Sequence, residues 1–137
     1  MTIAFNIRRA APIAAPIIAL GLMLAVTPTA MSAEVLQSGS FVGQSDHITT
    51  GTATIQKDGN SVVLVLGSNF SLDGAPDPTV GFTRNGKFIP ASQVAELKML
   101  NGRQTYTLPK GFLAQAYDAV TIWCRKFSVP LGSAKLS

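Results

Sequence analysis

Two glycine-containing turn signals, set between short apolar runs, constrain the fold of this chain more than any other feature. Asp58-Gly59 and Asn85-Gly86 favour two-residue hairpin turns, because both residues of each pair tolerate positive φ. Residues 52–56 alternate apolar and polar side chains, which is typical of a half-buried strand. Residues 62–66 are apolar on both faces, which is typical of a central strand. The sequence therefore predicts antiparallel hairpins at its centre.

The rest of the chain from residue 34 continues this pattern of short strands between turns. Pro76 and Pro78 cannot donate ladder hydrogen bonds, so the residues around them are expected to form a loop or the entry to an edge strand. Further strands are predicted at residues 38–44, 103–109, 119–129 and 131–136.

One segment, residues 91–102, carries a helical pattern instead. Ser92 can cap the first turn, and Val94, Leu97 and Leu100 recur at helical spacing before Asn101-Gly102 ends the run. With this helix included, the expected fold is all-β. It is an antiparallel β-sandwich or a partly closed β-barrel of about seven or eight short strands, with at most one short helix.

The first 33 residues are expected to be a signal peptide rather than part of that fold. Arg8 and Arg9 precede an uncharged, mostly apolar run at residues 10–26, and small residues follow as far as Ala33, with cleavage expected after Ser32 or Ala33. The run is short and interrupted for a membrane span, which needs about 20 apolar residues. We therefore expect a periplasmic or extracellular protein with one β domain at residues 34–137 and no stable membrane insertion after cleavage.

The charge of the chain gives no reason to expect a nucleic-acid partner. The sequence holds 11 Lys and Arg residues against 7 Asp and Glu residues, and two of those cations, Arg8 and Arg9, belong to the expected leader, which leaves 9 − 7 = +2. No segment after residue 33 clusters cations with interleaved aromatic residues, as a strand-binding surface does.

Cys124 is the only cysteine, and it is the main candidate functional residue. Because an exported protein meets an oxidising compartment, a lone thiol is buried and inert, paired between chains, or used chemically. Val120, Ile122 and Cys124 share one face of the strand at 119–129, whereas Phe127 falls on the other. A β-bulge at residues 125–126 would turn Phe127 back to the core. Trp123 would then point away from Cys124, onto the opposite face.

His47 is the only histidine, and its position in a polar turn favours an ordinary surface residue. If it is a ligand, the one soft partner in the sequence is Cys124. One His and one Cys are too few ligands for a zinc or iron–sulfur site, so no metal site is predicted. No nucleophile or acid–base constellation can be assembled either, so we favour a protein that is not a substrate-converting enzyme.

Four segments of the chain resemble the DM-thirteen domain, an electron-transfer family that also occurs as a single domain in exported bacterial proteins. They are residues 38–55, 66–82, 100–109 and 119–136. Ile122-Trp123-Cys124 is the most specific motif, with Cys124 on the family's signature cysteine and His47 where many members have a histidine. Ala75 stands where the family usually has glycine, a change that affects loop shape rather than chemistry.

The resemblance implies a redox role in which Cys124 acts as a bare thiol or holds a prosthetic group. Haem is the cofactor that this reading allows, with Cys124 and His47 as its ligands, and a redox protein of the cell envelope is the implied partner. The alternative is a non-catalytic binding or structural module of the cell envelope, in which Cys124 is core packing.

Overall fold

The structure is a computed structural model that describes residues 12–19, 21–28 and 33–137. Residues 12–19 and 21–28 form no helix or strand. No helix in these described ranges is long and apolar enough to span a membrane. The cations expected to open the signal peptide, Arg8 and Arg9, and the expected cleavage residue Ser32 lie outside the described residues.

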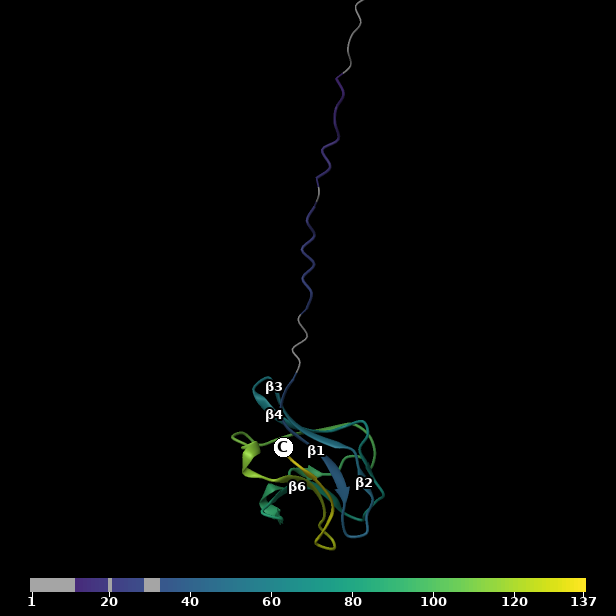
Figure 1. The fold of residues 1–137 in the computed structure, drawn as a ribbon, viewed down its shortest axis with the longest axis vertical. Helices are drawn as coiled ribbons and strands as arrows, with labels where there is room; N and C mark the ends of the chain where they lie inside the picture. The colour runs from purple at the N-terminus through teal and green to yellow at the C-terminus, as the bar shows by residue number, and fades with distance from the viewer. Residues whose placement is uncertain (1–11, 20, 29–32) are drawn as a thin grey trace, which may run out of the picture. The chain divides into compact units, whose positions relative to one another are not determined.

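One curled antiparallel sheet forms the β domain, and it makes a half-barrel rather than a closed one (Figure 1). The strand order is β7-β6-β10-β11-β1-β3-β4-β9, so β7 and β9 are its open edges. The strands are β1 (Glu34–Gly43), β3 (Thr52–Asp58), β4 (Ser61–Leu66), β6 (Pro78–Arg84), β7 (Lys87–Ile89), β9 (Gln104–Thr107), β10 (Ala119–Cys124) and β11 (Val129–Lys135). The expected all-β, partly closed barrel is confirmed.

Three very short strands complete the fold. β8 (Ala95–Glu96) pairs with β6 beyond the end of β7, and β2 (Thr49–Thr50) pairs with β5 (Ser71–Leu72) in a separate two-stranded sheet. Two three-residue 3-10 helices, η1 (Pro90–Ser92) and η2 (Ala114–Ala116), lie in the connections, and there is no α-helix in the described part of the chain.

The two predicted hairpins are present, but one turn is displaced by a residue. Asn85 and Gly86 occupy the β6–β7 turn with φ of 51° and 74°, as expected for this pair. In the first hairpin Asp58 pairs with Ser61, so the turn residues are Gly59 and Asn60 rather than Asp58 and Gly59. Gly59 takes the first turn position with φ of 60°, where glycine is preferred and Asp58 can remain in the strand.

The helix predicted at residues 91–102 is wrong, because tertiary hydrogen bonds hold this segment extended. The backbone N–H groups of Val94 and Leu97 donate to the carbonyls of Val80 and Pro78, which places β8 on the edge of β6. Ser92 does not cap a helix; its hydroxyl bonds to both backbone groups of Phe82. Of the apolar residues that suggested a helix, Val94 and Leu97 pack against the core, whereas Leu100 is 42% exposed.

The strand predicted at 119–129 is shorter, and the bulge proposed inside it is wrong. β10 ends at Cys124, residues 125–128 form the turn to β11, and Phe127 is 62% exposed rather than directed to the core. A register shift does occur, but between Ile122 and Trp123, whose partners are Gly132 and Pro130. Pro130 lies within β11 rather than separating two strands. Ser128 takes φ of 52° to complete the turn, so strand alternation does not continue through it.

The core fills the concave side of the sheet. Val120, Ile122 and Cys124 of β10 face it, together with Phe70 and Phe82. Phe41 packs edge-on against Phe70 with ring centroids 5.3 Å apart. β4 is buried along most of its length, as its apolar sequence predicted for a central strand.

Candidate functional site

Cys124 is the last residue of β10, at the point where the sheet gives way to the 125–128 turn. It pairs with Pro78 of β6 on one side and with Val129 of β11 on the other. Its side chain faces the core and is 1% exposed. The thiol is therefore almost completely covered.

Trp123 lies on the opposite face of β10, as predicted. Its ring stacks on the ring of Phe88, with centroids 4.3 Å apart and planes 7° from parallel. Cys124 belongs to the core cluster, whereas Trp123 lines a groove on the outer face of the sheet. These two neighbouring side chains therefore lie in separate environments, Cys124 in the core and Trp123 at the outer groove.

Residues 73–77, which we call the cover loop, adjoin Cys124. Ala75 of this loop packs against the core, and the loop leads directly into Pro78, the β6 residue paired with Cys124. The backbone N–H of Arg125 donates to the carbonyl oxygen of Asp77 at 3.1 Å. The end of β10 and the end of the cover loop are thus joined next to the thiol.

Arg125 reinforces this junction with its side chain. The guanidinium donates to both carboxylate oxygens of Asp77, at 2.9 and 3.1 Å, and to Glu96 of β8 at 2.8 Å. The hydrogen bonds from Arg125 lower the pKa of Asp77, and the two carboxylates raise the pKa of Arg125. All three groups are solvent-accessible, so the interaction fastens the loop without being buried.

His47 fastens the other end of the cover loop. Its Nδ1 lies 2.8 Å from Oδ1 of Asp73, and the Ile48 N–H donates to Oδ2 at 3.0 Å. The backbone hydrogen bond from Ile48 is the main cause that lowers the pKa of Asp73, and the His47 contact adds to it. In the described structure, no hydrogen bond joins the Cys124 thiol to His47.

The β10–β11 turn and the β1–β2 loop lie at the same end of the domain, seen at the bottom of Figure 1. The Gln44 N–H donates to the carbonyl of Leu131 at 3.0 Å, and the Thr49 hydroxyl donates to the same carbonyl at 2.8 Å. The His47 and Cys124 segments therefore share one rim of the half-barrel, although their side chains have different partners.

The arrangement of Cys124 and His47 does not fit a haem. The thiol is enclosed by core side chains, and His47 Nδ1 is engaged by Asp73. Two cavities on the domain surface are lined by other residues. Among the described residues no group of three metal-ligating side chains is present. What this rim offers chemically is a buried thiol next to a loop that is held by polar contacts at both ends.

Sequence reasoning missed the roles of three acidic residues at this rim. Asp73 and Asp77 flank the prolines of the expected loop, and Glu96 falls in the segment that was expected to be helical. The partner of Asp73, His47, lies 26 residues away in the chain, and the partner of Asp77, Arg125, lies 48 residues away. No local pattern connects residues so far apart.

Comparison with known families identifies the β domain. The family model described as Electron transfer DM13 matches residues 40–136, which span β1 to β11, both ends of the cover loop, His47 and Cys124. Comparison with curated proteins and with solved structures gave no match. The match covers more than half of the chain, and it includes all four segments noted in the sequence except residues 38 and 39. This protein therefore belongs to the Electron transfer DM13 family.

Proposed function

We propose that this protein is an exported electron-transfer domain in which the Cys124 thiol is the redox group. The observation that carries the proposal is the position of the single cysteine. It closes β10 beside a loop whose two ends are held by solvent-accessible contacts, the Arg125–Asp77 ion pair at one end and the His47–Asp73 hydrogen bond at the other. The thiol thus lies at the end of a strand and directly beside a loop, not in the middle of the sheet.

The redox step is thiol–disulfide exchange with a protein of the cell envelope. The Cys124 thiol loses its proton to solvent, and the thiolate attacks one sulfur of a disulfide in the partner. A bond forms between Cys124 and that sulfur as the partner's disulfide breaks, and the second partner sulfur leaves as a thiolate. A thiolate from a further thiol then attacks the partner's sulfur in this mixed disulfide, forms a new disulfide with it and releases Cys124 as a thiolate.

A bare thiol is favoured over haem ligation for a geometric reason. Haem ligation by Cys124 and His47 would require both side chains to face one cleft, and each is already engaged elsewhere. Thiol exchange needs only one accessible sulfur, which brief displacement of the cover loop would supply. Local opening of this kind is common in loops that have few buried contacts.

The second candidate is a binding or structural module of the cell envelope with Cys124 as packing. Its support is the 1% exposure of Cys124 and its place in the core cluster with Ile122. Free cysteine is among the most buried residue types, so burial by itself agrees with this reading. The two functions differ in whether the thiol becomes accessible while the domain stays folded.

Thiol reactivity in the folded protein tests the proposal. The substitution Arg125→Gln removes the guanidinium that binds Asp77 and Glu96, and Lys126→Gln removes an adjacent exposed cation that forms no ion pair in the described structure. We expect Arg125→Gln to accelerate reaction of Cys124 with 4,4′-dithiodipyridine about twofold to fivefold, and Lys126→Gln to leave the rate unchanged. Cys124→Ser sets the background.

The packing reading makes a different prediction for the same measurement. The thiol would then react only when the whole domain unfolds, so its rate in each variant would follow global stability measured by urea unfolding. That result would remove the redox proposal. A mixed disulfide between Cys124 and an envelope protein, trapped by acid quenching and absent from Cys124→Ser, would support it.

Export is tested separately, by intact-mass measurement on protein from the expressing cell's envelope or medium. We expect a mass that lacks residues 1–32 or 1–33. A mass that retains these residues would indicate an uncleaved anchor.

A further inference from the structure

The outer face of the sheet carries a groove, on the side of β10 opposite Cys124. It has a volume of about 600 Å³ and is lined from β6, β7, β10 and β11 and by Gln44, which follows β1. Sites for small molecules usually enclose about 300–1,000 Å³. The groove is therefore large enough for a small ligand, and it shares no lining residue with the cover loop.

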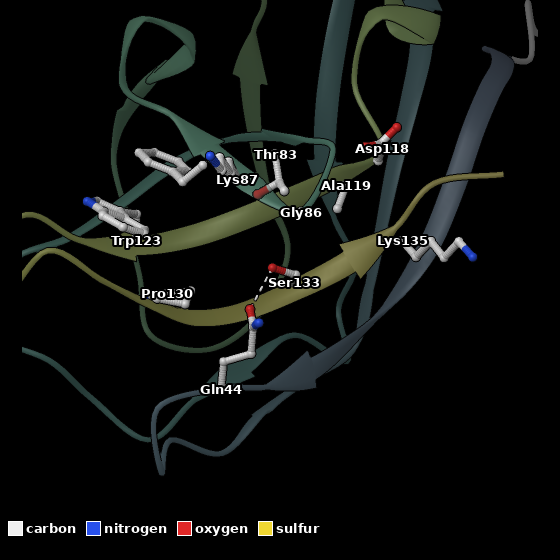
Figure 2. A pocket seen from close by; sticks show the side chains of 11 residues that line it. Gln44, Thr83, Gly86, Lys87, Asp118, Ala119, Trp123, Pro130, Ser133 and Lys135 are labelled. Atoms are coloured by element: carbon white, nitrogen blue, oxygen red, sulfur yellow. Dashed lines mark hydrogen bonds between the residues drawn. The ribbon is translucent and has the colours of Figure 1, made fainter.

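A row of hydrogen-bonded polar side chains crosses the outer face at this groove. Thr83 of β6 contacts Thr121 of β10 at 2.6 Å, Thr121 contacts Ser133 of β11 at 2.9 Å, and Ser133 donates to Gln44 Oε1 at 2.7 Å. Figure 2 shows the last of these contacts as a dashed line. Thr121 is 0% exposed although it lies on the outer face, so the row is an ordered part of the fold.

The direction of the protons along this row follows from the number that each hydroxyl carries. Ser133 gives its single proton to Gln44, so Thr121 must donate to Ser133, and Thr83 must donate to Thr121. The row therefore ends in a hydroxyl oxygen with a free lone pair at Thr83. At its other end is the amide NH₂ of Gln44, which has no partner among the described residues. The groove offers an acceptor at one end and a donor at the other.

Two aromatic rings also line the groove beside this polar row. Phe88 and Trp123 are stacked, and both rings remain partly exposed. A Cβ on Gly81 would lie 2.8 Å from the Phe88 ring, so glycine at this β6 position is what allows the ring to lie close to the sheet. The groove thus combines an apolar surface with a line of neutral hydrogen-bonding groups.

Three charged side chains line the groove, those of Lys87 in β7, Asp118 and Lys135. Figure 2 shows the side chains of Lys135 and Asp118 directed away from the Ser133–Gln44 pair. One carboxylate oxygen of Asp118 accepts from the Asn85 N–H. The hydrogen-bonded row of Thr83, Thr121, Ser133 and Gln44 carries no charged group, whereas a phosphate or carboxylate is usually held by cationic donors and a metal ion by several acceptors.

We propose that this groove binds a neutral saccharide of one or two rings. A sugar presents apolar C–H faces that pack on aromatic rings, and hydroxyl groups that both donate and accept, which suits a row ending in one acceptor and one donor. The proposal does not depend on redox chemistry at Cys124, because the two sites lie on opposite faces of β10.

Trp123 provides a direct test because it is the only tryptophan in the chain. Its fluorescence is followed while the protein is titrated with cellobiose, maltose, chitobiose and methyl β-glucoside, and sugar contact is checked by saturation-transfer NMR. We expect at least one probe to bind at millimolar or lower concentration. If none of the four changes either signal at 50 mM, the proposal fails. It also fails if naphthoquinone sulfonate binds there and the sugars do not, which would mark a site for planar aromatic compounds.

Variants locate the binding. Gln44→Ala removes the free donor from an exposed residue and should weaken the best sugar about fivefold to tenfold. Gln115→Ala, an exposed amide that does not line the groove, is the matched control and should bind as wild type does. Equal affinity in wild type and Gln44→Ala would overturn the assignment. Cys124→Ser should retain full binding, so failure of the redox proposal would leave this one standing.

Discussion

Adjacent residues of β10 lie in different environments, because one face of the strand packs in the core and the other borders a groove. On the concave face, Val120, Ile122 and Cys124 are buried to 1% exposure or less among core side chains. On the convex face, Trp123 is only half-buried and borders an open groove whose floor includes hydrogen-bonded hydroxyls. Strand alternation alone separates them, because successive side chains point to opposite faces. One strand can therefore hold a protected thiol and an accessible binding surface without mixing the two.

The concave face tolerates change poorly, and truncation there should have the largest effect. Ile122 is 0% exposed, so Ile122→Ala removes buried apolar atoms and leaves a cavity beside Cys124. We expect a loss of about 2–5 kcal/mol in the free energy of unfolding, measured by urea denaturation. Ser133→Ala on the convex face serves as the comparison and should cost about 1 kcal/mol or less. Equal costs would mean that the faces do not differ as described.

Adding atoms to the concave face should also be costly. Gly132 pairs with Ile122, and a Cβ placed on it would lie 2.5 Å from the Cβ of Thr49, whose hydroxyl is tied to Leu131. Gly132→Ala should therefore destabilise the domain by about 1–3 kcal/mol. Thermal unfolding with Gly59→Ala as a control separates crowding from strain, because Gly59 has open space around it but a φ of 60°. Normal stability of Gly132→Ala would show that β2 can move away from β11.

Some of this contrast follows from sequence and some does not. Alternation placed Trp123 opposite Cys124, and the Asn85-Gly86 pair located a hairpin, because both signals are local. Helical spacing at residues 91–102 predicted the wrong element, since hydrogen bonds from this segment to β6 hold it extended. The parity argument at Phe127 failed for a related reason: it assumed that the strand continued, whereas the chain turns after Cys124. The ion pairs of the cover loop join distant segments and carry no local signature.

Lowering the pH should make the Cys124 thiol more accessible to reagents in solvent. The folded state lowers the pKa of Asp73 mainly through the hydrogen bond from the Ile48 N–H and also through His47. The hydrogen bonds from Arg125 lower the pKa of Asp77. Their stabilisation is therefore present above the ordinary carboxyl pKa of about 3.9 and is lost as pH falls through the lowered values.

The measurement is the rate of reaction of Cys124 with 4,4′-dithiodipyridine, divided by the rate for free cysteine at the same pH. Between pH 6 and pH 3 this ratio should rise about twofold to fivefold while circular dichroism still reports a folded domain. The double variant Asp73→Asn, Asp77→Asn should show a raised ratio that no longer depends on pH in this range. A flat ratio in the wild type would mean that these pairs do not hold the cover loop closed.

The smallest effect on stability is expected for a substitution at Phe127. It distinguishes a strand that continues past Cys124 from a chain that turns there. If strand alternation with a bulge continued past Cys124, Phe127 would be a core residue, and truncating it would cost about 3–5 kcal/mol. In the turn seen here Phe127 is 62% exposed, and the Lys126 ammonium lies 5.7 Å from its ring centroid. An exposed cation–π contact contributes about 0.5–1 kcal/mol, and surface substitutions usually stay within about 0.5 kcal/mol. Phe127→Ser should therefore shift the urea midpoint little and leave the reactivity of Cys124 unchanged. A loss above about 2 kcal/mol would place Phe127 inside the rim, and the thiol would then be covered from the β10–β11 turn as well as from the cover loop.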